Sequence, residues 1–137
     1  MDGDRAARVI ARSARKDIEQ TVSDLMTLVR TGKPRQIQHP FTGKPHDMAS
    51  AEAKAMAKHI EAAKLSTNEE FLGALEKVLH ATASAPISNF FTAYDGEGGF
   101  DEDLWIEMTT EAGEKIPHYL HEIAYSKDGE ASGPSKA

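Results

Sequence analysis

The chain has 137 residues, of which 39% are hydrophobic and 28% are charged, and its formal net charge is −6. This length suits one globular domain and is too short for two ordinary ones. There are no cysteines, which excludes disulfides, thiolate nucleophiles and cysteine-ligated zinc, so histidine, carboxylate or carbonyl groups must supply any metal ligands.

Charge is distributed unevenly along the chain. Residues 1–46 carry nine Lys and Arg against five Asp and Glu, whereas residues 47–137 carry seven against seventeen. The acidic part would repel phosphates, so a general nucleic-acid binder is not expected. The first residues lack the apolar core of a signal peptide and no later run is long enough to span a bilayer, so we expect a cytoplasmic protein without a membrane partner.

Apolar residues recur every three or four positions from Ile10 to Val29, which predicts an amphipathic helix over about residues 4–30. Gly32 suits the left-handed position that ends a helix, and Pro34 prevents the helix from resuming. A separate arc of this helix carries a basic ridge. Such a ridge is typical of a solvated helix face, but it is also a candidate contact for an acidic partner or RNA; its residues are Arg5, Arg8, Arg12 and Arg15.

The next segment, residues 31–46, repeats Thr-Gly-Lys-Pro and is expected to consist of turns and extended chain. A second helix is predicted to start near Asp47 or Ser50 and to run to about Lys64. Residues 66–70 then predict a new helix start, because a serine or threonine cap precedes a glutamate by three residues. This third helix is expected to end around residues 82–84.

Pro86 suits the first turn of a short fourth helix, in which Ile87, Phe90, Phe91 and Tyr94 share one face, although a strand is the alternative. After a glycine-rich turn, alternation over residues 104–109 predicts a half-buried strand with a short partner around Lys115 and Ile116. Pro117 is expected to open a last helix.

The predicted fold is therefore mainly α, of the α+β type. It is a helical bundle of four to five helices with a small two-stranded β element near the C-terminus. Residues 1–125 are expected to form a single globular domain, and residues 126–137, which are rich in Gly, Ser and Lys, a disordered tail.

A cation site is one hypothesis for the C-terminal part. On a helix, His118 would share a face with His121 and Glu122, which suits zinc or another divalent cation, with a further ligand from Asp95, Glu97, His59 or His80. The order His-x-x-His-Glu is not that of the zinc proteases, and chance histidines at this spacing are the plain alternative. The acidic loop Asp95–Asp103 does not match an EF-hand calcium loop, because Phe100 and Ile106 occupy its two decisive positions. A solvated acidic turn is favoured there, and a non-standard cation loop is the alternative.

One resemblance covers roughly the last third of the chain. An aromatic-rich segment ends in Asp95-Gly96 and is followed by Trp105, Gly113-Glu114, Leu120-His121-Glu122 and Tyr125. This order resembles a pattern in small uncharacterised bacterial proteins, a domain family of unknown function. The resemblance implies a bacterial source and a recurrent domain, and it implies no activity.

These patterns predict a non-catalytic binding or regulatory protein that acts on a protein partner through a charged surface. An acidic inhibitor or immunity-type protein that neutralises a basic protein fits the acidic part, because opposed fields speed docking. The acidic residues expected at the interface are Glu97, Asp101, Glu102 and Asp103. The alternatives are a metal-dependent enzyme at the histidine site and RNA or DNA contact through the basic ridge.

Overall fold

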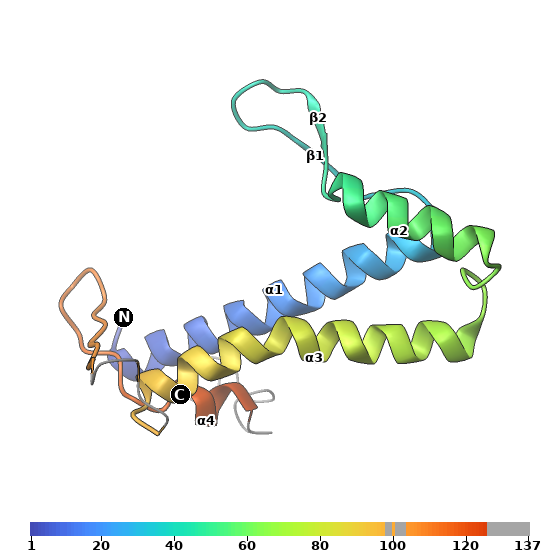
Figure 1. The fold of residues 1–137 in the computed structure, drawn as a ribbon. Helices are drawn as coiled ribbons and strands as arrows, with labels where there is room; N and C mark the ends of the chain where they lie inside the picture. Colours follow the sequence, from blue (N-terminus) through green and yellow to red (C-terminus); the bar gives the residue numbers. More distant parts are fainter. Residues whose placement is uncertain (98–99, 101–103, 126–137) are drawn as a thin grey trace. The chain divides into compact units, whose positions relative to one another are not determined.

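The computed structural model describes residues 1–97, 100 and 104–125. These residues form four helices and one two-stranded antiparallel sheet, so the chain is mainly helical (Figure 1). Contacts divide the chain into a first unit, residues 1–18 with 84–137, and a second unit, residues 19–83. The elements are α1 (Gly3–Thr31), β1 (Gln36–Gln38), β2 (Pro45–Asp47), α2 (Ala51–Ala62), α3 (Glu69–Tyr94) and α4 (Leu120–Tyr125).

Helix α1 begins and ends where the sequence predicts. The carboxylate of Asp2 accepts a hydrogen bond from the Arg5 amide at 2.8 Å and so satisfies a free donor of the first turn. At the other end, Gly32 has a φ of +72° and its amide donates to the Leu28 carbonyl at 2.7 Å. This left-handed glycine closes the helix as expected.

The third and fourth predicted helices are a single helix, α3, with Pro86 inside it. The prediction of a break at Pro86 is therefore wrong. Proline removes one backbone donor, but the helix continues on both sides of Pro86. Phe91 and Tyr94 are therefore on the buried face of the same helix. The predicted serine or threonine cap is also wrong, because the side chain of Asn68 accepts from the Phe71 amide at 3.0 Å and occupies the cap position.

The sheet lies in the N-terminal half of the chain, so its predicted place near the C-terminus is wrong. β1 and β2 form an antiparallel hairpin in which Gln36 pairs with Asp47 and Gln38 with Pro45. Where strands were expected, the described residues contain one isolated bridge, Thr109 to Lys115. Around this bridge the amide of Ile116 donates to the carbonyl of Met108 at 2.9 Å and the amide of Thr110 to the carbonyl of Glu114 at 2.8 Å, but no strand forms among the described residues here.

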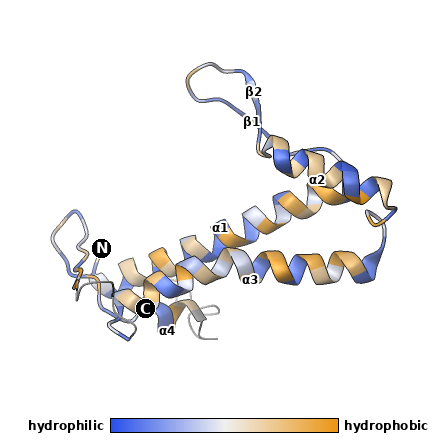
Figure 2. Cartoon of the chain, in the orientation of Figure 1, coloured by the Kyte–Doolittle hydropathy of each residue, from blue (hydrophilic) through white to orange (hydrophobic). Residues whose placement is uncertain are grey.

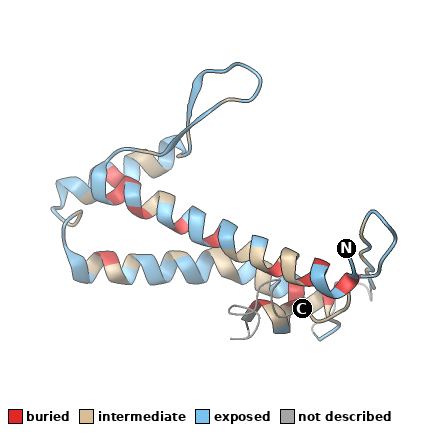
Figure 3. Cartoon of the chain, turned by 180° about the vertical axis from the view of Figure 1, so that it is seen from behind, coloured by how far each residue is buried: buried red, intermediate tan, exposed pale blue. Residues whose placement is uncertain are grey.

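The core of the first unit is built on small residues of α1. Alanines let the backbone of α1 approach closely, and the aromatic side chains of α3 and the apolar residues of α4 pack against them. Figure 3 shows buried residues in red on these helices. The predicted aromatic stripe is thus partly core, since Phe91 and Tyr94 are buried. The buried cluster comprises Ala6, Ala7, Ala11, Phe91, Tyr94, Ile116, Leu120 and Ala124.

The second unit has a smaller set of buried residues. Figure 2 shows hydrophobic and hydrophilic residues alternating along α1, the pattern that gives this helix one apolar face. Within the described part of the chain, none of the helices combines the length and apolar character needed to cross a membrane. The buried apolar residues of this unit are Val22, Met26, Leu28, Val29, Ala57 and Leu72.

Candidate partner-binding surface around Trp105

His118 lies between two aromatic rings of the first unit. Its ring centroid is 4.3 Å from that of Tyr94, at 19°, and 4.2 Å from that of Trp105, at 28°. The Nε2 atom is 2.9 Å from the carbonyl oxygen of Ile106, so this contact requires Nε2 to carry the proton and donate. The stack and the hydrogen bond together fix the indole of Trp105 in one orientation.

Trp105 is fixed in this way but not covered. It is 58% exposed, and its neighbour Leu104 is 55% exposed. On one side the indole lies against Gly96, where a Cβ atom would come within 3.0 Å of the Trp105 Cζ3 atom. Because Gly96 also has a φ of +85°, both the space and the backbone favour glycine there.

Carboxylates flank these two apolar side chains along the chain. Glu97 follows Gly96 and is exposed, and Glu107 is exposed and lies 3.3 Å from Lys115 (Oε2 to Nζ). An exposed ion pair of this kind contributes little stability, so Glu107 can exchange partners. We call the set Gly96, Glu97, Leu104, Trp105 and Glu107 the Trp105 surface.

Buried hydrogen bonds hold the backbone beneath this surface. The hydroxyl of Tyr94 donates to the carbonyl of Ile116 at 2.7 Å and accepts from the amide of Met108 at 3.3 Å. Burial raises the pKa of Tyr94 above its usual value, which further favours the protonated hydroxyl that donates this bond. Tyr94 thereby ties residues 108 and 116 to the end of α3.

Asp95 makes a second connection. Its Oδ1 accepts from the amide of Leu120 at 2.7 Å and its Oδ2 from the amide of His121 at 2.8 Å. A carboxylate at the N-terminus of a helix satisfies free donors and faces the positive end of the helix dipole. The first residue of α4 is therefore placed by the residue that follows α3, which is why α4 begins at Leu120 and not at Pro117.

The predicted acidic interface is only partly within the described residues. Glu97 is exposed and belongs to the Trp105 surface. Asp101, Glu102 and Asp103 lie outside the residues that the structure describes. Of the acidic residues expected at the interface, Glu97 alone can therefore be related to a described neighbour.

The basic ridge of α1 is not simply a solvated face. Arg5 is exposed, but Arg8, Arg12 and Arg15 are half-buried. The guanidinium of Arg15 donates to the carbonyl of Ala124 in α4. The Nε atom of Arg8 is buried and has no hydrogen-bond partner among the described residues. At least part of the ridge therefore serves packing inside the first unit.

The residues of the cation hypothesis do not share one helix face. His118 precedes α4 and is held in the aromatic stack, whereas His121 and Glu122 lie in α4. Among the described residues, no three or more His, Cys, Asp or Glu side chains form a group that could hold a metal ion. Asp95, a candidate further ligand, is engaged by two backbone amides. Zinc or another divalent cation at this place stays a prediction.

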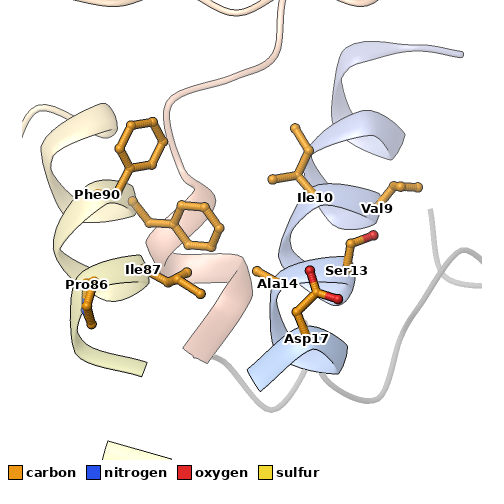
Figure 4. Close-up of a pocket in the computed structure, with 9 residues that line it drawn as sticks. Val9, Ile10, Ser13, Ala14, Asp17, Pro86, Ile87 and Phe90 are labelled. Atoms are coloured by element: carbon orange, nitrogen blue, oxygen red, sulfur yellow. The ribbon is translucent and has the colours of Figure 1, made fainter. Parts of the chain in front are cut away.

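An open apolar groove lies between α1 and α3 in the first unit, with a volume of about 490 Å³ (Figure 4). Phe90, which is 42% exposed, stands at one side and Asp17 at the other. The groove has the character of a hydrophobic recess, and no cluster of titratable groups suited to catalysis lines it. Its residues are Val9, Ile10, Ser13, Ala14, Asp17, Pro86, Ile87, Phe90 and Phe91.

Comparisons with protein-family models, with curated proteins and with solved structures each gave no match. The resemblance to small bacterial proteins therefore stays a prediction.

Proposed function

We propose that this chain is a non-catalytic binding or regulatory protein that captures a basic protein partner through the Trp105 surface, in the manner of an acidic inhibitor or immunity-type protein. The observation that carries the proposal is an exposed tryptophan whose indole is stacked on His118. Tryptophan is enriched among the residues that dominate binding energy in interfaces. A side chain that is already ordered loses little rotamer entropy on binding.

The distribution of charge supports a basic partner. The second unit contains eight Lys and Arg and eight Asp and Glu, so it is neutral by formal charge. The first unit contains eight against fourteen, and it therefore carries the whole net charge of −6. The Trp105 surface belongs to this acidic unit. A basic partner would be attracted over distance and then anchored by the indole.

The test compares capture by surface variants. Wild-type chain, Trp105→Ala and Glu97→Lys are immobilised, and the proteins retained from a cell extract at low and high salt are identified. We expect wild type to retain one or more basic proteins that Trp105→Ala loses, since truncating a central tryptophan costs about 2 kcal/mol or more, roughly 30-fold in affinity. Glu97→Lys should weaken the same capture most strongly at low salt.

Two controls make the result specific. Glu61 is exposed in α2 and is not part of the Trp105 surface, so Glu61→Lys makes the same charge change at a residue outside that surface. It should retain the partner, whereas a general ion-exchange effect would weaken both lysine variants alike. Trp105→Phe keeps a ring against His118 and should recover part of the binding. Unchanged capture by Trp105→Ala would refute the proposal.

A further inference from the structure

The β1–β2 hairpin buries little of its own surface. All three residues of β1 are exposed, as are two of the three in β2 (Figure 3). A lone two-stranded hairpin is marginally stable in water and gains from a further strand or a covering helix. Ile37 and Met48 are each 38% exposed and fall on the same hairpin face by the alternation of side chains.

The hydrogen bonds of the hairpin define which backbone groups face outward. The amide of His39 donates to the carbonyl of Lys44 at 2.8 Å, and the amide of Met48 donates to the carbonyl of Arg35 at 2.7 Å. Hydrogen-bonded pairs alternate along an antiparallel ladder, so the amide and carbonyl of Ile37 also point toward β2. The amides and carbonyls of Gln36 and Gln38 therefore point away from β2, along the open edge of β1.

The two edges of the hairpin are not equivalent. On β2 the outward-facing residues are Pro45, which has no amide hydrogen, and Asp47, whose side chain is bonded to Gln36 and Lys54. Proline and charge on an edge strand are common means of preventing further pairing. β1 has neither, because its sequence is Gln-Ile-Gln. The open edge of the hairpin is thus β1.

We infer that β1 pairs antiparallel with β1 of a second copy of this chain, so that two hairpins join into one four-stranded sheet. The sequence Gln-Ile-Gln reads the same in both directions, and a two-fold axis at Ile37 sets Gln36 opposite Gln38 of the second copy. Both of these residues have outward-facing backbone groups, so each pair exchanges its amide and carbonyl bonds. Ile37 meets its own copy across the axis, in a closely spaced pair.

The electrostatics of the edge permit this pairing. β1 carries no charge, and the guanidinium of Arg35, which precedes it, is paired with the carboxylate of Asp24 at 2.8 Å (Nε to Oδ1). The pairing also extends an apolar strip, because Ile37 and Met48 of both copies fall on one face of the joined sheet. The interface is symmetric and closes at two copies. With such short strands it should be weak and depend on concentration.

A cysteine cross-link tests the register. The chain has no cysteine, so Ile37→Cys introduces a single thiol. In the inferred sheet the two Cα atoms at this position are about 4.5 Å apart, within the range that a disulfide spans. Ile37→Cys should form a disulfide-linked dimer rapidly under mild oxidation. Phe41→Cys is the control, because Phe41 is 92% exposed but far from the two-fold axis.

Sedimentation over a wide concentration range tests the edge without a cross-link. Gln38→Pro removes an outward amide and leaves the β1–β2 ladder intact, whereas Gln38→Ala keeps that amide. Both variants lose the side-chain bond of Gln38 to the Gly43 carbonyl. We expect wild type and Gln38→Ala to dimerise with rising concentration and Gln38→Pro to remain a monomer.

Either of two results would overturn the inference. One is a wild-type chain that stays monomeric up to near-millimolar concentration, which would leave the β1 edge to a strand of a different protein. The other is an Ile37→Cys chain that cross-links no faster than Phe41→Cys. The inference is independent of the proposed function, because the hairpin belongs to the second unit and the Trp105 surface to the first.

Discussion

Asp95 illustrates how one side chain can connect segments that are distant in the sequence. It directly follows α3, and its two carboxylate oxygens bind the first two amides of α4. α4 has only six residues, too few to be stable as an isolated helix. Its existence therefore depends on this cap and on the packing of Leu120 and Ala124 in the core.

Replacing Asp95 with alanine should lower the free energy of unfolding by about 1–2 kcal/mol, because two helix amides lose their acceptor. Asp95→Asn keeps one acceptor oxygen and should cost less. Urea denaturation followed by circular dichroism measures both. Glu97→Ala, two residues further on and exposed, is the matched control and should change stability by less than about 0.5 kcal/mol. Equal effects of the two alanine variants would mean that the cap does not hold α4.

Tyr119 makes the stability of the folded chain decrease at alkaline pH. Burial, a hydrogen bond to the carboxylate of Asp4 and the charge of that carboxylate raise the pKa of Tyr119 to about 12. A tyrosine in the unfolded chain ionises near 10. The contribution of protonated Tyr119 to the free energy of unfolding is therefore fully present below about pH 10 and is lost as pH rises toward about 12.

The midpoint temperature of thermal unfolding should therefore fall as the pH is raised from about pH 10 upward. Tyr119→Phe should make the decline shallower, because phenylalanine cannot ionise. Some decline should remain, since burial also raises the pKa of Tyr94. If Tyr119→Phe declines as steeply as wild type, the hydroxyl of Tyr119 is not responsible.

At the scale of elements, the first turn of α1 lies unusually close to the C-terminal segment. A Cβ atom on Gly3 would come within 1.9 Å of the carbonyl oxygen of Lys115, a distance that no backbone tolerates without moving. Gly73, inside α3, has nothing within 4 Å of the same position. The two glycines therefore have opposite roles: one permits a contact, and the other only weakens a helix.

The pair Gly3→Ala and Gly73→Ala should change stability in opposite directions. Gly73→Ala should stabilise by about 0.5–1 kcal/mol through helix propensity and a less flexible unfolded chain. Gly3→Ala should destabilise by about 1 kcal/mol or more, because α1 must move away from Lys115. The denaturant midpoint of each variant, compared with that of wild type, measures the change in stability. Stabilisation by both would show that the first turn of α1 adjusts without cost.

The elements that the sequence predicts well are those with a periodic apolar pattern and a local stop signal. α1 is predicted almost to the residue, because a long stripe ends in Gly32 and Pro34. Pro86 misleads, since a proline signal cannot tell the start of a helix from a tolerated place inside one. The hairpin is missed because β1 and β2 are short and rich in Gln, Pro and His, which carry little strand preference.

The Trp105 surface was less accessible to prediction than the fold. Tyr94, Trp105 and His118 are separated by more than ten residues each, and no periodicity links them. Their stacking follows from the bonds of Asp95 and Tyr94 to the segments that contain them. The sole tryptophan next to a glycine-rich turn was the available signal, and it indicated an unusual segment without indicating its partners.

For the whole molecule, the two units offer a test of cooperativity. Leu120 is fully buried in the first unit and Leu72 in the second. Leu120→Ala should cost about 2–5 kcal/mol and should speed amide hydrogen exchange mainly in the first unit, as Leu72→Ala should in the second. If the rate of amide hydrogen exchange rises uniformly over the whole chain in either variant, the molecule unfolds in a single step.

The way the first unit is assembled from both ends of the chain has a consequence for synthesis. Protein is made from the N-terminus, at about 5–20 residues per second. Ala6, Ala7 and Ala11 therefore leave the ribosome long before Leu120 and Ala124, against which they pack. The second unit is continuous and has all its residues by position 83. The nascent chain thus carries an apolar stripe on α1 without its native partners until Leu120 and Ala124 have been made.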